Sequence, residues 1–220
     1  MIIDCISDLH GSFPELTGGD LLIVAGDLTA RDTDAQHLDF IEWLAMRQEF
    51  GDKYNKVIYI GGNHDGMLDP YQKRYGPVKT PEKWNIEYLC DSGIEFGGFK
   101  IWGSPWTPTF CNWYFMQDRG EQIRKRWEMI PKDTEILITH GPPYGILDKV
   151  DISSKGDKFK RAGCMDLMDI IPTLPNLKLH VFGHIHESPG VEEIRGTKFV
   201  NASIMNEHYR PVNKPIRIEL

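Results

Sequence analysis

Polar, ligand-type residues follow apolar runs at five places, and this pattern constrains the 220-residue chain more than any other feature. The clearest case is Gly62-Asn63-His64-Asp65, which comes after the apolar run Val57 to Ile60. Alone, such a sequence is also typical of an ordinary turn. At the end of a buried strand, however, these polar groups cost free energy unless something binds them. Four similar clusters occur along the chain: Asp8-x-His10, Gly26-Asp27, His140-Gly141 and Gly183-His184-x-His186. Together they indicate a metal site.

The apolar runs predict β-strands with few helices between them. Residues 2–6 form a short β-branched run, and residues 21–25 are apolar at every position, which is typical of a strand covered on both faces. The spacing of Leu38, Ile41, Leu44 and Ala45 predicts a helix over 34–50, with Asp32 or Thr33 as its N-cap. Further strands are predicted over 56–60, 86–90, 99–103, 135–139, 177–182, 197–201 and 216–220, and a charged surface helix over 118–129.

The middle of the chain, residues 71–113, is rich in proline, glycine and aromatic residues. Here the segments 86–90 and 99–103 are predicted to be strands of one meander, joined by the glycine turn at 97–98. The aromatic residues of this region are interpreted as core between sheet and helix, and a platform that stacks a base is the alternative. These residues are Trp102, Trp106, Trp113, Tyr114 and Phe115.

The composition is ordinary for a globular protein, with 40% hydrophobic and 26% charged residues. We expect one domain over residues 1–220, since the chain shows no repeat and no linker. No apolar run approaches the ~20 residues that cross a bilayer, and the start of the chain leads directly into a strand pattern. A cytoplasmic protein without a membrane segment is therefore expected. Its four cysteines form no Cys-x-x-Cys pair and are predicted to be reduced thiols.

A formal net charge of -7 argues against an extended nucleic-acid surface. Two basic runs, 124–126 and 155–161, are interpreted as solvated surface, with phosphate contact as the alternative. Two of the histidines outside the five clusters also have alternative interpretations. We interpret His180, inside a strand, as a hydrogen-bonded core residue, and His208 as an exposed loop residue rather than a substrate contact.

Each cluster directly follows a predicted strand. Because open α/β sheets place their ligands at the carboxyl ends of the strands, we expect the clusters to converge at one edge of the sheet. Carboxylate, amide and imidazole donors suit Mn, which we favour, or Fe, Zn, Co or Mg. Seven ligands exceed the capacity of one four- to six-coordinate ion, so two divalent metal ions that share a carboxylate are predicted. Such a pair clamps a phosphate and activates a hydroxide. The predicted ligands are Asp8, His10, Asp27, Asn63, His140, His184 and His186.

In this order the five clusters resemble the calcineurin-like metallophosphoesterase superfamily. The C-terminal half is similar to its metallophosphoesterase-domain-containing branch, through residues 139–143, 162–164, 179–187 and 200–203. The resemblance implies an α/β fold in which a sandwich of two mostly mixed β-sheets is flanked by helices. It also implies metal-dependent phosphodiesterase activity, including activity on 2',3'- or 3',5'-cyclic nucleotides.

Carried over by position, the resemblance divides the ligands between two ions. One ion takes Asp8, His10, Asp27 and His186. The other shares Asp27 as a bridge and takes Asn63, His140 and His184. His64 then faces the substrate and gives a proton to the leaving oxygen, while Asp65 orients His64 or caps the following helix.

The chain departs at one point from the pattern of the superfamily's protein phosphatases, and this difference bears on the substrate. The superfamily's protein phosphatases continue Gly-Asp with an Asp-Arg-Gly segment, whereas Gly26-Asp27 is followed here by residues 28–32, Leu-Thr-Ala-Arg-Asp. The extra C-terminal domain of the DNA-repair nucleases is also not seen. A diesterase acting on small substrates is therefore favoured. A phosphomonoesterase or nucleotidase, a nuclease on structured nucleic acid and a non-catalytic metal-binding scaffold are the alternatives, and a homodimer stays open.

Overall fold

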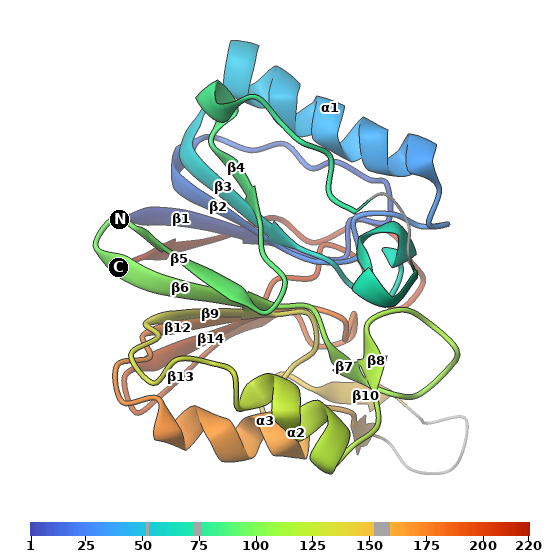
Figure 1. The fold of residues 1–220 in the computed structure, drawn as a ribbon, viewed down its shortest axis with the longest axis vertical. Coiled ribbons are helices and arrows are strands. Elements are labelled where there is room, and N and C mark those ends of the chain that lie inside the picture. Colours follow the sequence, from blue (N-terminus) through green and yellow to red (C-terminus); the bar gives the residue numbers. More distant parts are fainter. Residues whose placement is uncertain (52, 73–75, 152–158) are drawn as a thin grey trace.

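Two β-sheets pack face to face, with helices on their outer faces, in this computed structural model, which describes residues 1–51, 53–72, 76–151 and 159–220 (Figure 1). The first sheet has four parallel strands, and its fifth strand, at the edge, is antiparallel to β1. In spatial order its strands are β15 (Ile216–Glu219), β1 (Ile2–Ile6), β2 (Gly19–Ala25), β3 (Tyr54–Ile60) and β4 (Ile86–Tyr88).

The second sheet is also mixed, with four parallel inner strands and one antiparallel strand at each edge. Its order is β13 (Gly190–Ile194), β14 (Thr197–Asn201), β12 (Leu179–Phe182), β9 (Ile136–Thr139), β6 (Phe99–Ser104) and β5 (Ser92–Phe96). Two short pairs accompany the sheets: β7 (Thr107–Pro108) with β8 (Met116–Gln117), and β10 (Lys149–Asp151) with β11 (Phe159–Arg161).

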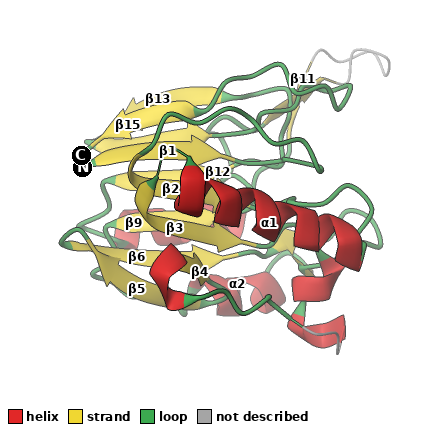
Figure 2. Cartoon of the chain, turned by 90° about the horizontal axis from the view of Figure 1, so that it is seen from above, coloured by secondary structure: helices red, strands yellow, loops and turns green. Residues whose placement is uncertain are grey.

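Helices cover both outer faces, so the predicted sandwich of two mixed sheets between helices is confirmed. The long helix α1 (Asp34–Phe50) lies over the first sheet (Figure 2). The short helices α2 (Glu121–Trp127) and α3 (Met165–Ile170) lie over the second (Figure 1). Of the two predicted caps, Thr33 is the one used, since its side chain accepts from the Gln36 N–H. Short 3-10 turns occupy Gly66–Leu68, Pro70–Gln72, Glu82–Trp84 and Ile171–Thr173. None of the helices in the described ranges has the length and apolar character needed to cross a membrane.

The uniformly apolar strands bury both faces, and alternate side chains enter different layers. In β2, Leu21 and Ile23 pack between the two sheets. Leu22 and Val24 point the other way and join the cluster that includes Phe40 of α1. The continuous hydrophobicity of residues 21–25 thus follows from a strand between two apolar layers.

The predicted meander is wrong. The segment at 86–90 gives β4 of the first sheet, whereas β6 belongs to the second sheet and pairs with β5, which was not predicted. The Gly97-Gly98 turn joins β5 to β6. Alternation of apolar residues identifies a strand but not its partner, and the chain crosses between the sheets just after β4. The helix predicted over 118–129 is shorter, Glu121–Trp127, and is partly buried through Ile123 and Trp127.

Helix α1 buries Ile41 and Leu44 of the predicted apolar spacing, but it departs from that spacing at one position. Leu38 is 50% exposed, whereas His37 is buried. Within the described structure, neither ring nitrogen of His37 has a hydrogen-bond partner, and burial lowers its pKa to about 4.

Two other predictions about buried polar and thiol groups are confirmed. The Nε2 atom of His180 lies 2.8 Å from the Thr139 hydroxyl, as expected of a hydrogen-bonded core residue. All four cysteines are free thiols, as predicted.

We predict that His37 makes the protein sensitive to acid. An unfolded histidine has a pKa near ~6.5, so between pH 6.5 and 4 the unfolded chain binds a proton that the folded chain does not. The free energy of unfolding therefore falls as the pH is lowered through this window, and is fully retained above it. Relative to the unsubstituted protein, His37→Leu should retain about 3 kcal/mol more of its unfolding free energy at pH 4.

Urea unfolding at pH 7, 5.5 and 4 measures this difference. His208→Leu is the matched control, because it makes the same substitution at an exposed side chain and removes no buried group. Parallel pH profiles for His37→Leu and the unsubstituted protein would contradict the prediction.

Candidate metal centre

The five ligand clusters meet at one end of the sandwich, but they come from both sheets. Three follow β1, β2 and β3 of the first sheet, and two follow β9 and β12 of the second. The expectation of a single sheet edge is therefore corrected. The site lies in the seam between two sheets because their parallel strands end at the same side of the molecule (Figure 1).

Backbone hydrogen bonds hold this seam together. The Ser7 N–H donates to the Ala202 carbonyl at 2.8 Å, and the Ile204 N–H donates to the Ser7 carbonyl at 3.0 Å. Gly183 approaches the same point so closely that a Cβ atom on it would lie 2.2 Å from an oxygen of Asp8. Only glycine therefore allows the end of β12 to reach the end of β1.

Several of the candidate ligands have strained backbones. Asp8, His10, Asp27 and His184 adopt φ values of 56°, 44°, 53° and 69°. In this left-handed region a residue with a Cβ atom costs roughly 1–2 kcal/mol. Strain of this kind persists where the surrounding structure enforces it, commonly at functional sites. Here it turns the side chains that follow three different strands toward one point.

The converging side chains form two groups around a shared carboxylate. In the first group, of Asp8, His10 and His186, the His186 Nε2 atom lies 3.4 Å from the Asp8 Oδ1 atom. In the second, of Asp27, His140 and His184, the His140 Nε2 atom lies 3.4 Å from the Asp27 Oδ1 atom. The other oxygen of Asp27 is 3.6 Å from His10 Nε2, so this carboxylate lies between the groups. Asn63 joins the second group, with its Oδ1 atom 3.0 Å from His140 Nε2.

The residues fit divalent cations. His10 is the clearest sign, because its side chain is 4% exposed and yet neither of its ring nitrogens has a hydrogen-bond partner among the described residues. Asp8 and Asp27 are also buried. Buried polar atoms without partners are costly, and coordination of a cation would remove that cost. Oxygen and imidazole donors without thiolates suit Mn, Fe, Zn or Co.

The charges are arranged for cation binding. Burial alone would raise the pKa of Asp8, but the hydrogen bond and charge of His186 outweigh it and lower the pKa to about 2. Against the same effect of burial, His140 holds the pKa of Asp27 well below its usual range. Burial lowers the pKa of His184 to about 3. Against burial, the same pairing with carboxylates raises the pKa of His140 to about 9 and also raises that of His186. Metals coordinate ionised carboxylates and neutral imidazoles, so binding of cations would displace the protons of these two rings.

The Asp65 side chain makes different contacts from those expected. Its carboxylate neither orients the His64 ring nor caps the 3-10 turn that follows. It accepts backbone N–H groups from Leu28, Thr29 and Gly62 at 2.9–3.0 Å. These bonds tie the loop after β2 to the loop after β3, so Asp65 positions the segments that carry Asp27 and Asn63. This contact between two loops far apart in the chain is not revealed by sequence spacing.

His64 lies at the rim of the centre. Its backbone N–H donates to Asp27 Oδ1 at 2.8 Å, and its ring Nδ1 atom lies 3.3 Å from the Ala30 carbonyl oxygen. It also forms a third group of ligand atoms with His10 and Asp27. The geometry therefore leaves room for a substrate-facing role and for coordination.

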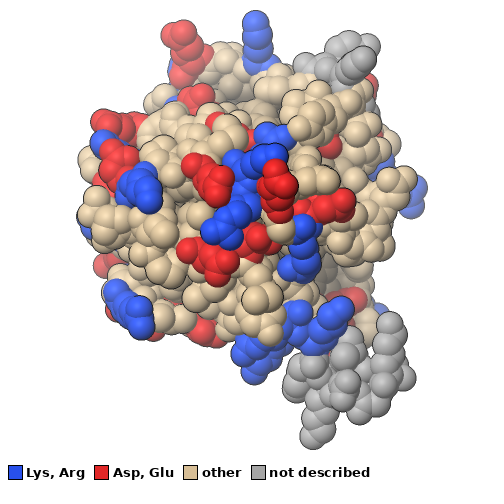
Figure 3. All heavy atoms as spheres, turned by 60° about the horizontal axis from the view of Figure 1, so that its bottom comes forward, with Lys and Arg blue, Asp and Glu red and all other residues tan. Residues whose placement is uncertain are grey.

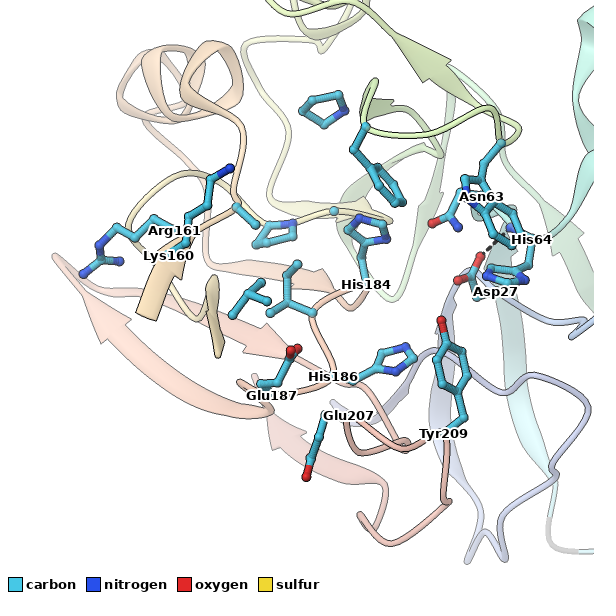
Figure 4. Close-up of a pocket in the computed structure, with 18 of the residues that line it drawn as sticks. Asp27, Asn63, His64, Lys160, Arg161, His184, His186, Glu187, Glu207 and Tyr209 are labelled. Atoms are coloured by element: carbon cyan, nitrogen blue, oxygen red, sulfur yellow. Dashed lines mark hydrogen bonds between the residues drawn. The ribbon is translucent and has the colours of Figure 1, made fainter. Parts of the chain in front are cut away.

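A cavity of about 430 Å³ opens beside the centre (Figure 4). Its lining combines Asp27, Asn63 and His64 with residues that the motifs did not identify. Trp106 and Phe115 are core residues, as interpreted from the sequence, but Trp113 is 42% exposed and its ring lies 4.2 Å from that of His64. His208 is exposed, as expected, whereas its neighbour Tyr209 lines the cavity.

The sequence left Trp113 open as part of a stacking platform, but it carried no signal for Tyr209, which lies on a loop after the last ligand cluster. Lys160 and Arg161 line the far end of the same cavity, and Arg161 is paired with Asp148. The remainder of that basic run, up to residue 158, lies outside the described residues.

Comparisons with known proteins agree on one family. Residues 1–188 match the family described as calcineurin-like phosphoesterase. Metallophosphoesterase domain-containing protein 1 of Homo sapiens and that of Mus musculus are each 37% identical over 98% of this chain and 70% of their own length. A phosphopantetheinyl hydrolase from Mycobacterium tuberculosis shares the fold, with a TM-score of 0.53 at 16% identity over 97% of this chain and 95% of that one.

The match to the family and the two relatives cover the strand ends from which all seven candidate ligands come. This chain therefore belongs to the calcineurin-like phosphoesterase family and is a metal-dependent phosphoester hydrolase.

Proposed function

We propose that this protein hydrolyses small phosphodiesters, cyclic nucleotides foremost, at a centre of two divalent cations within a single catalytic domain of residues 1–220. The observation that carries the proposal is the position of Asp27 between two groups of ligand atoms. One cation would be held by Asp8, His10, Asp27 and His186, and the other by Asp27, Asn63, His140 and His184. When bound, such a pair polarises a phosphoryl group and lowers the pKa of a coordinated water molecule.

The chain itself supplies orientation and a proton. Asp65 fixes the loops that carry Asp27 and Asn63. The His64 ring is held by the Ala30 carbonyl beside the centre and next to the cavity. From there it can donate a proton to the oxygen that leaves when the ester bond breaks. That step matters most for a sugar alkoxide, which is a poor leaving group.

The cavity supports a small substrate. Its volume of about 430 Å³ falls within the range of small-molecule sites, about 300–1,000 Å³. The molecular face formed around α2 and α3 carries charges of both signs side by side (Figure 3), including the ion pairs Lys125–Glu121 and Arg124–Asp169. That face offers no uniform basic surface of the kind an extended nucleic acid requires.

Activity should depend on added metal. We expect a chelator to abolish hydrolysis and Mn to restore it best, because the candidate ligands are hard oxygen and imidazole donors. The measurement is a panel of cyclic nucleotides, linear diesters and monoesters, assayed after dialysis and addition of Mn, Zn, Co or Mg. Full activity with excess chelator would refute metal dependence. Preference for a monoester over a diester with the same leaving group would favour a phosphomonoesterase.

Asp27→Ala should be the most damaging change of a ligand, because it removes the carboxylate shared by both groups. Loss of a residue that only supports a ligand already costs about 10–100-fold in metal affinity or activity, so we expect a loss beyond about 100-fold. Metal content should fall as well. Asp39→Ala, on the exposed face of α1, is the control. Near-native turnover with two metals per chain would show that Asp27 is not the bridge.

His64→Ala should distinguish substrates by their leaving groups. General acid catalysis contributes about 10²–10⁴-fold, and a nitrophenolate leaves without a proton. Hydrolysis of a cyclic nucleotide should therefore fall by about this factor, while hydrolysis of bis(4-nitrophenyl) phosphate falls much less. Both metals should stay bound. Equal losses on the two substrates would argue against proton donation, and loss of a metal would make His64 a ligand.

A further inference from the structure

Tyr209 lies directly over the candidate metal centre. Its ring centroid is 4.9 Å from that of His10 and 4.9 Å from that of His186, and it meets both rings edge-on. It lies 6.5 Å from the His64 ring and lines the cavity. Figure 4 shows the Tyr209 ring between His186 and His64, with its hydroxyl directed toward Asp27. This one side chain thus touches ligands of the first group and faces the shared carboxylate.

The turn that presents Tyr209 is rigidly built. The side-chain oxygen of Asn206 accepts the N–H groups of His208 and Arg210, each at 3.0 Å. At the base of the turn, Met205 pairs with Pro211. The Asn213 side chain secures this base further, since it donates to the carbonyls of residues 203 and 205. A pinned turn holds its tip residue in place without help from a ligand.

Two features of Tyr209 have no structural use. Its φ of 56° is costly for a bulky residue, and glycine or asparagine would suit the position better. The residue is 57% exposed, so burial does not offset the strain. Its hydroxyl makes no hydrogen bond to any residue in the described part of the chain. A phenol O–H that is strained into place beside cation ligands is available to a bound molecule.

We propose that Tyr209 contacts the substrate and that its phenol O–H donates a hydrogen bond to a phosphoryl oxygen held at the centre around Asp27. The proposal rests on the proposed function, since it assumes a phosphoester at this position. The ring also lines the cavity, as Trp113 does, so the two side chains limit what enters with the phosphoryl group. The turn at 206–210 is therefore part of the substrate site, through Tyr209 rather than through His208.

Tyr209→Phe tests the hydroxyl alone, and the ring it keeps should preserve the fold. The Mn-loaded variant is examined for metal content, for affinity for inorganic phosphate by calorimetry, and for kcat/KM on bis(4-nitrophenyl) phosphate. A hydrogen bond to a charged group is worth about 10- to 100-fold in affinity. We expect phosphate affinity and kcat/KM each to fall by about that factor, with metal content and thermal unfolding unchanged.

His208→Ala is the matched control, because the adjacent side chain on the same turn is exposed and lies off the cavity. It should leave all four measurements unchanged. Unaltered phosphate affinity and kcat/KM in Tyr209→Phe would overturn the proposal, and so would a loss of metal, which would make Tyr209 a ligand. If the unsubstituted protein hydrolyses no phosphodiester, the proposed function fails, but phosphate affinity still decides the role of Tyr209.

Discussion

Two buried carboxylates, Asp8 and Asp27, impose the constraint on which the rest of the structure depends. An ionised group in an apolar interior is stable only when other groups compensate its charge. Here the backbone N–H groups of His184 and His64 donate to these carboxylates, and histidines from both sheets surround them. Neither sheet alone supplies enough partners. The seam between the sheets is therefore the place where strand ends of both sheets meet and where the candidate ligands gather.

The side chains at this seam are held in precise positions by backbone features that would destabilise an ordinary turn. A Cβ atom on Gly62 would lie 2.3 Å from an Asp27 oxygen, so that position too requires glycine. The left-handed residues at Asp8, Asp27 and His184 add strain at the same point. The apolar layers on both faces of strands such as β2 are extensive enough to hold this strain in place. The strain at the site thus lowers the stability of the fold, while the adjacent apolar layers raise it.

The strands and the loops contribute different parts of the site. The strand ends fix the candidate ligands, while the walls of the cavity come from irregular segments that carry Phe110, Trp113 and Tyr209. Rigid elements hold groups that must keep fixed distances, and loops can vary without disturbing the core. This division suits a family in which one metal-dependent chemistry serves different phosphoesters.

The sequence by itself determined the strands of the two sheets other than β5 and β13, the helix over 34–50 and the candidate ligands. It did so because buried strands require continuous apolar runs, and polar residues at their ends stand out against them. It could not determine which strands share a sheet, since side-chain alternation does not name a partner. For that reason β4 and β6 were wrongly joined. Only the tertiary structure placed the ligands in a seam between two sheets, gave Asp65 its backbone partners and brought Tyr209 over the centre. These features depend on contacts between residues far apart in the chain, which local patterns do not encode.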